Sequence, residues 1–257
     1  MKNGLTALFL LICFSTFAQS PVAKRVTSGA DMGYAFRKDH YNPSLTYYQL
    51  LNIGERRLIS LGWTAKLGAF YGDNLNYITA PARLSRGETG FGALSAPLIN
   101  ENIDTVRFDW VSTTALNLGV RAQVNLGIVQ LGASADLVGI GFGGRRTGRY
   151  ISSNGEFISG QDADGEPIIS PFSQNIYQQA TVPRFNLQLL GDNSYGTLST
   201  EVYGRVRLGQ RLLLKAGAQW LMTEVRTDAV NLVDNNRRFR NTSGTMVYLG
   251  LTFPFFY

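Results

Sequence analysis

Apolar and polar side chains alternate over a long stretch in the middle of the chain. From Val106 to Leu126 the even-numbered positions are mostly apolar, and residues such as Arg107 and Asp109 lie between them. A period of two indicates a β-strand with one face in an apolar medium and the other in polar surroundings. After a turn at 125–127 the alternation resumes from Val129 to Leu137 with the opposite parity. The two runs predict a hairpin whose strands are longer than those of ordinary globular proteins. The residues expected outward on the first strand are Val106, Phe108, Trp110, Leu116, Leu118, Val120, Ala122, Val124 and Leu126.

Six further segments alternate in the same way, although 45–51 does so less regularly. They are residues 26–37, 45–51, 59–71, 198–208, 212–222 and 247–257. In the segment 198–208, for example, Leu198, Val202 and Val206 form the apolar face, and Glu201 and Arg205 lie on the polar face. Tight turns are expected at 52–55, 125–127 and 209–210, and longer connections at 38–44, 72–105, 143–195 and 226–241.

This alternation of short and long connections predicts a membrane barrel. Outer-membrane barrels have an even number of antiparallel strands, short periplasmic turns and long outer loops. We therefore expect an all-β fold, a transmembrane antiparallel up-and-down β-barrel of about eight strands, with residues 20–257 as a single domain in the outer membrane of a Gram-negative bacterium. A ten-stranded barrel stays open as an alternative, because Phe185, Leu187 and Leu189 also alternate.

The inward faces of the predicted strands carry both signs of charge. Eight strands enclose a space that side chains just fill. The sequence thus predicts a lumen plugged by ion pairs, and a proton or ion path is the alternative. The residues concerned are Asp31, Asp136 and Glu201, with Lys66, Arg121, Arg205, Arg207 and Lys215.

The N-terminus has the features of a secretory signal peptide. Lys2 precedes an apolar run from Leu5 to Phe17, which is followed by the small residue Ala18. We expect residues 1–19 to be cleaved. Because Cys13 is the only cysteine of the sequence, the mature chain would have neither a disulfide nor a thiol nucleophile.

The C-terminus resembles the aromatic signal that the barrel assembly machinery reads, with Phe253, Phe255 and a terminal Tyr257. Together with the strand pattern, the chain resembles the small outer-membrane barrels of the OmpX and OmpA type. The end of the signal peptide, Phe17 to Ser20, is similar to those of the Bacteroidota. These resemblances imply an eight-stranded barrel that the assembly machinery inserts into the outer membrane.

Three local motifs are weak candidates for chemistry. Residues 139–144 match the pattern G-x-G-x-x-G, but Arg145 and Arg146 follow where a nucleotide site needs a helix. The segment 162–166 contains three carboxylates, but its sequence departs from the EF-hand pattern, and we interpret it as a solvated turn. His40, the only histidine, is expected at the barrel rim. We predict no catalytic residue, no cofactor and no metal site.

Arginines gather near the predicted outer rim. Arg145, Arg146 and Arg149 follow the central hairpin, and Arg237, Arg238 and Arg240 precede the last strand. Since guanidinium groups bind phosphate with two hydrogen bonds, we expect these six residues to contact lipopolysaccharide, with scattered solvated charge as the alternative. Nucleic acid is not expected as a partner of an exported protein.

The expected function is that of a non-enzymatic outer-membrane barrel whose long outer loops have a surface or partner-binding role. A narrow solute channel is one alternative, and a lipid-modifying enzyme is another. A soluble periplasmic barrel would leave its apolar stripes in water.

Overall fold

The computed structural model describes residues 25–54, 57–151, 156–171, 177–189, 193–209, 211–228 and 236–256. The predicted signal peptide and Tyr257 lie outside these ranges. The strands are β1 (Val26–Arg37), β2 (His40–Ile53), β3 (Ile59–Thr79), β4 (Thr105–Leu126), β5 (Val129–Phe142), β6 (Arg146–Ile151), β7 (Glu156–Gln161), β8 (Pro167–Pro171), β9 (Tyr177–Thr181), β10 (Phe185–Leu187), β11 (Leu198–Arg207), β12 (Leu213–Thr227) and β13 (Arg238–Phe256). The helices are α2 (Ala82–Ser85), η2 (Gly90–Leu94) and η3 (Asn100–Asn102). None of the helices in these ranges is long and apolar enough to cross a membrane.

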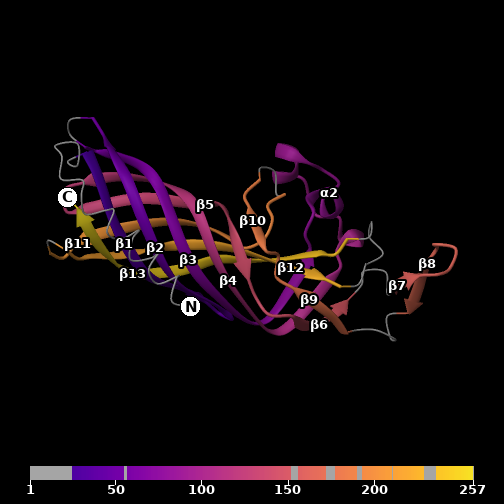
Figure 1. The fold of residues 1–257 in the computed structure, drawn as a ribbon. Helices are drawn as coiled ribbons and strands as arrows, with labels where there is room; N and C mark the ends of the chain where they lie inside the picture. Colours follow the sequence, from indigo (N-terminus) through magenta and orange to yellow (C-terminus); the bar gives the residue numbers. More distant parts are fainter. Residues whose placement is uncertain are drawn as a thin grey trace, which may run out of the picture.

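Eight strands close into an antiparallel barrel. The ring runs β1–β2–β3–β4–β5–β11–β12–β13 and returns to β1 through pairs such as Met32 with Leu251. Both ends of the described chain lie at the same end of the barrel as the turn after Leu126 (Figure 1). The predicted antiparallel eight-stranded fold is thus confirmed.

The segment that suggested ten strands forms only a short insertion. The three-residue strand β10 pairs with the outer part of β5, where Phe185 lies opposite Ile140, and Leu187 bridges to Tyr195. Phe185 and Leu187 are exposed beside the apolar wall, whereas Asn186 is buried. β10 therefore completes the wall locally between β5 and the start of β11.

Beyond the membrane barrel, six strands continue as a narrower ring, which we call the collar. It consists of the outer parts of β3, β4, β12 and β13 together with β6 and β9, paired in the order β3–β4–β6–β9–β12–β13 and back to β3. In Figure 1 these strands extend beyond the main barrel toward α2. Each strand of the collar contributes an apolar side chain to a common core, namely Tyr77, Phe108, Tyr150, Ala180, Val225 and Phe239.

The collar corrects one prediction of side-chain direction. Val106 and Phe108 are fully buried in the collar core, whereas Arg107 and Asp109 are exposed. The parity changes on both strands at the same level, because Asp109 and Trp110 are both exposed on β4 and the paired β3 has a φ of 51° at Asn74. The register is the same on both sides of this point, with Asp73 opposite Trp110 and Leu75 opposite Phe108, so the two strands reverse their faces together. The outer medium is then water, so the apolar residues turn inward.

The long connections contain more regular structure than the sequence predicted. The expected loop 38–44 is a two-residue turn, and β2 begins at His40. β3 and β4 extend into the expected loop 72–105 and leave 80–104 as the connection, which holds α2, η2 and η3. The connection 143–195 contains β6 to β10, of which β7 and β8 form a separate hairpin. Tertiary pairing around the collar stabilises short strands that have no strong pattern of their own.

Candidate functional site

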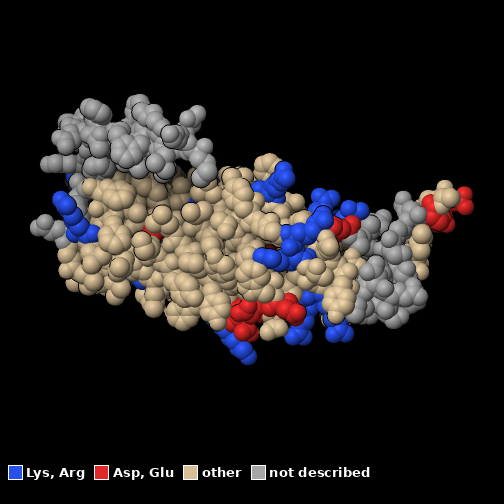
Figure 2. Space-filling model, turned by 60° about the horizontal axis from the view of Figure 1, so that its bottom comes forward, with Lys and Arg blue, Asp and Glu red and all other residues tan. Residues whose placement is uncertain are grey.

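The outer wall of the barrel is apolar. Alternate side chains of β4 such as Leu116, Leu118 and Val120 are each between 43% and 52% exposed. Figure 2 shows the wall with few charged side chains between charged groups at its two ends. Leu198, which the sequence placed outward, is buried at the start of β11. The apolar wall requires a lipid environment, because water would leave a very large hydrophobic surface exposed.

Aromatic side chains border this wall at both ends. At the collar end, the rings of Tyr34 and Tyr41 stack with centroids 6.5 Å apart. At the other end, the rings of Tyr47 and Trp63 lie 5.3 Å apart. Amphipathic rings of this kind gather at the two membrane interfaces of transmembrane barrels.

A buried ion network centred on Asp31 crosses the lumen. The Asp31 carboxylate lies 2.8 Å from Arg121 Nη2, 2.8 Å from Arg205 Nη2 and 3.0 Å from Lys215 Nζ. It also accepts a hydrogen bond of 2.7 Å from the Thr252 hydroxyl. These residues come from β1, β4, β11, β12 and β13, so the network connects strands around the ring.

Glu201 extends the network toward β3. Its carboxylate lies 2.5 Å from Lys215 Nζ, 3.4 Å from Arg121 Nη2 and 3.9 Å from Lys66 Nζ. The predicted crossing of the lumen by ion pairs is therefore confirmed for these residues. Arg207 is an exception, because its side chain is exposed at the opposite end of the barrel from the collar.

Three tyrosines cover the cations of the network. Tyr48 lies 4.8 Å from the guanidinium carbons of both Arg121 and Arg205, measured to the ring centroid. Tyr203 and Tyr248 lie 4.3 Å and 4.6 Å from Lys215 Nζ. Cation–π contacts of this kind strengthen when water is excluded.

Inward glycines provide the space for these rings. A Cβ at Gly33 would overlap the Tyr248 hydroxyl, and one at Gly29 would lie 2.5 Å from the Tyr48 hydroxyl. The sequence pattern did not predict these pairs. An inward tyrosine opposite a glycine on a neighbouring strand would have predicted such a pair. The prediction requires the register between the strands, which the sequence alone does not give.

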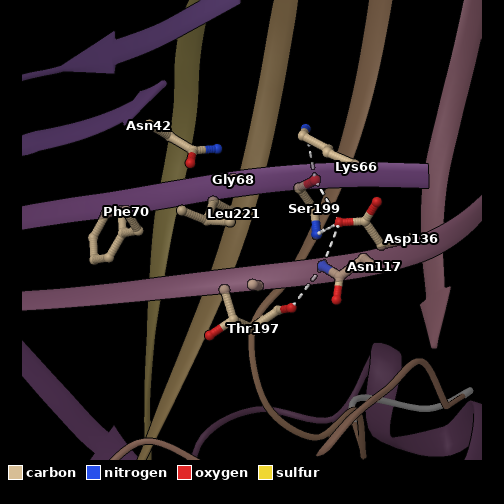
Figure 3. A pocket seen from close by; sticks show the side chains of 10 residues that line it. Asn42, Lys66, Gly68, Phe70, Asn117, Asp136, Thr197, Ser199 and Leu221 are labelled. Carbon is tan, nitrogen blue, oxygen red and sulfur yellow. Dashed lines mark hydrogen bonds between the residues drawn. The ribbon is translucent and has the colours of Figure 1, made fainter. Parts of the chain in front are cut away.

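Figure 3 shows a second polar layer around a small cavity. On β4 its residue Asn117 lies between Arg121 of the ion network and Phe108 of the collar core. Lys66 donates to the Ser199 hydroxyl, which donates to Asp136 at 2.7 Å. Asn117 donates to Asp136 and accepts a hydrogen bond of 2.7 Å from Asn186 of β10. The cavity in this layer has a volume of about 10 Å³, which is room for about one water molecule.

The two ends of the lumen differ from the ion network and polar layer at its centre. At the end opposite the collar, a polar vestibule of about 320 Å³ is lined by Arg57, Gln123 and Arg207, among others. At the other end, the aromatic collar core follows directly, with the rings of Tyr77 and Phe108 at 5.3 Å in edge contact. A solute entering the vestibule would meet first buried ion pairs and then a packed apolar core.

The local motifs have structural roles. His40 Nε2 lies 3.2 Å from the Asn241 side chain and Nδ1 lies 2.9 Å from the Lys38 carbonyl, at the rim as predicted. After residues 139–144 the chain continues into the strand β6 rather than into a helix. Asp162 accepts hydrogen bonds from the backbone N–H groups of Asp164 and Glu166 in the turn between β7 and β8. In the described ranges, no group of three or more His, Cys, Asp or Glu side chains is arranged to hold a metal ion.

The six predicted rim arginines lie in different environments. The Arg146 guanidinium carbon lies 4.3 Å from the ring centroid of Trp110, at the membrane border. Arg145 pairs with Asp228 at 3.3 Å, and Arg149 is exposed. Arg237 is half-buried, and Arg238 pairs with Glu224. Arg240 is buried, with only 8% of its surface exposed.

No protein-family model matches the sequence, and no curated protein matches it. Among solved structures, a major outer membrane protein from Thermus thermophilus is similar, with 11% identity, a TM-score of 0.39, and coverage of 90% of this chain and 99% of that one. Neisserial surface protein A (NspA) has 10% identity and a TM-score of 0.30, covering 89% of this chain and 94% of that one. The CymD monoaromatic hydrocarbon channel has 10% identity and a TM-score of 0.18, covering 92% of each chain. Such low values carry no information about what this chain binds.

The structure of the barrel indicates the cellular location of the protein. In lipid, a closed strand ring satisfies the backbone hydrogen bonds of every strand. An apolar wall between aromatic borders and a charged interior are the features of outer-membrane barrels. The chain is an outer-membrane β-barrel. It belongs in the outer membrane of a Gram-negative bacterium.

Proposed function

We propose that this barrel is a non-enzymatic surface protein whose collar and outer connections bind a partner outside the cell. The observation that carries the proposal is the collar, a closed ring of strands with its own apolar core. A rigid frame of this kind holds connecting segments in fixed positions for recognition. The connection 80–104 and the segments between β6 and β11 are the binding elements in this proposal.

The buried contents of the barrel support this role over that of a solute channel. A channel needs a continuous polar path, whereas Asp31 and its cations fill the lumen and Phe108, Tyr77 and Phe239 fill the collar. An enzyme that modifies lipids needs a nucleophile and a base. His40, the only histidine, contacts a backbone carbonyl and an asparagine side chain.

Conductance separates the surface role from transport. The purified barrel in planar lipid bilayers is expected to give no steady single-channel current, because the ion network and the collar core block the lumen beyond the vestibule. A known open porin reconstituted in the same way serves as the control. Steady unitary currents from this protein would contradict the proposal and favour the channel.

We further propose that Arg145, Arg146 and Arg149 contact lipopolysaccharide. Arg146 stacks on Trp110 at the membrane border, where phosphorylated headgroups lie. Replacement of the three residues by Gln is expected to lower the amount of lipopolysaccharide that co-purifies, and an unchanged amount would contradict the contact.

The C-terminal aromatic residues are proposed as the signal for the assembly machinery. Phe253 and Phe255 face outward from β13, where a receptor could read them. A Phe255→Ser variant is expected to accumulate in the membrane more slowly in a pulse-chase experiment, and an unchanged rate would contradict this role.

A further inference from the structure

A hollow of about 460 Å³ lies on the collar beside β12 and β13. Three separate connections and β12 meet there. Figure 2 shows Lys and Arg side chains gathered over this half of the molecule. We call it the basic hollow, and its lining consists of Pro81, Arg83, Asn193, Tyr195, Arg226, Asn236, Arg237 and Arg238.

The guanidinium group of Arg238 is fixed in the lining. Its Nε and Nη2 lie 2.5 Å and 3.0 Å from the two Glu224 carboxylate oxygens. Nη2 also donates to the Ser194 carbonyl at 3.2 Å, and the guanidinium carbon lies 4.6 Å from the ring centroid of Tyr195. The Asn236 side chain holds the Arg238 backbone through hydrogen bonds of 2.7 Å and 3.0 Å. A cation held in this way loses little conformational freedom when a ligand binds.

The hollow has an excess of positive charge. Its lining includes four arginines. Glu224 is engaged by Arg238 and by the backbone N–H of Gly196. Asp228, two residues beyond Arg226, pairs with Arg145. Within the described ranges, no ion pair joins a carboxylate to Arg226 or Arg237.

The height of the hollow favours a sugar-borne anion over a buried lipid phosphate. Arg226 lies six residues further along β12 than Trp220, which is exposed at the apolar wall. At about 3.3 Å per residue and a tilt near 45°, this separation is roughly 14 Å along the membrane normal. The hollow is thus at the level of surface saccharides and solvent, and the amides of Asn193 and Asn236 border it.

We propose that the basic hollow binds a phosphate-bearing saccharide. Arg226 and Arg237 supply the hydrogen bonds to the phosphate, since guanidinium groups match its oxygen geometry. The saccharide is either the core of lipopolysaccharide or a free sugar phosphate, and both have the same chemistry. This inference deepens the proposed function, because it names a ligand class for the collar.

Calorimetric titration tests the proposal. The full-length mature protein in lauryldimethylamine oxide, a detergent without a sugar headgroup, is titrated with glucose 1-phosphate and with inorganic phosphate, and with glucose as the uncharged comparison. Glucose 1-phosphate is expected to bind and glucose is not. The double substitution Arg226→Gln and Arg237→Gln is expected to weaken binding about tenfold or more.

A matched variant controls for general charge attraction. Arg25→Gln with Arg211→Gln removes two exposed charges at the opposite end of the barrel and is expected to leave binding unchanged. Equal weakening by both variants would overturn the proposal. A titration in which neither glucose 1-phosphate nor inorganic phosphate binds would also overturn it. Heat-modifiable gel mobility verifies that each variant is folded.

Lipid analysis distinguishes the two sources of the saccharide. If the hollow variant binds glucose 1-phosphate more weakly and also co-purifies with less lipopolysaccharide, the ligand is the lipopolysaccharide core. If only the binding of the free sugar phosphate weakens, the ligand is soluble, and the site is supported either way. Failure of this titration leaves the conductance result unaffected, so the two proposals fail separately.

Discussion

At the scale of single residues, Asp31 determines how the barrel tolerates its charged interior. Three cations share this one carboxylate, and Thr252 donates to it as well. Buried charges are stable only when they are paired and hydrogen-bonded. Asp31 is therefore the residue whose loss leaves the most uncompensated charge in the lumen.

Asp31→Asn is expected to lower the free energy of unfolding by about 3–5 kcal/mol, because it leaves buried cations without their partner. Denaturant titration of the barrel in lipid vesicles measures the change. Asp109→Asn on β4 removes the same charge from an exposed position and is expected to have little effect. Similar losses for both variants would show that the network does not stabilise the fold.

At the scale of elements, positions of left-handed backbone conformation lie where two rings of opposite polarity meet. Asn74 on β3 and Gly244 on β13, with φ of 51° and 64°, both lie near the boundary between barrel and collar. On the membrane side of the boundary, charged residues such as Lys66 point inward. On the collar side, apolar residues such as Tyr77 do so. The strands thus continue without interruption while the exchange of lipid for water reverses which side chains are buried.

Phe108→Ala is expected to unfold the collar while the membrane barrel persists. Truncation of a fully buried phenylalanine costs about 3–5 kcal/mol, and the collar core is small. Protease digestion of intact cells should then cleave the collar connections, while the remaining fragment keeps its heat-modifiable mobility. Trp110→Ala, which removes an exposed ring on the same strand, is the control. Equal protease resistance of Phe108→Ala and the parent protein would contradict the collar core.

At the scale of the whole molecule, the two ends of the barrel are chemically distinct. The collar, the connection 80–104 and the hairpin β7–β8 lie at one end, and both ends of the described chain lie at the other (Figure 1). Outer-membrane barrels place short turns and both termini in the periplasm. We therefore expect the collar to face the outside of the cell.

Cysteine labelling tests this orientation. The only cysteine, Cys13, lies in the predicted signal peptide. An introduced cysteine is therefore expected to be the only thiol of the mature chain that the reagent can label. A membrane-impermeant maleimide is expected to label Arg107→Cys on intact cells, because this collar position is exposed. Arg211→Cys at the opposite end is expected to react only after the outer membrane is permeabilised. Labelling of Arg211→Cys on intact cells would reverse the assigned orientation.

The alternation of side chains determined the barrel. A period-two pattern states which residues face lipid, so the outward Leu116 to Leu126 series and the inward Asp31, Arg121 and Glu201 followed from the sequence. This works because a one-residue shift in register would expose charges to hydrocarbon, at a cost that the fold cannot offset. The pattern is local, and so it could be predicted.

Only the tertiary structure decided the collar, the short strand β10 and the basic hollow. Val106 and Phe108 continue the even-numbered pattern, and nothing in their spacing marks the point beside Asp109 at which β4 and its partner strand β3 reverse their faces together. Arg83, Arg226 and Arg237 are far apart along the chain and meet because the six collar strands close into a ring. Side-chain periodicity follows from backbone geometry within one strand, whereas bulges, ring closure and converging loops depend on which strands pair.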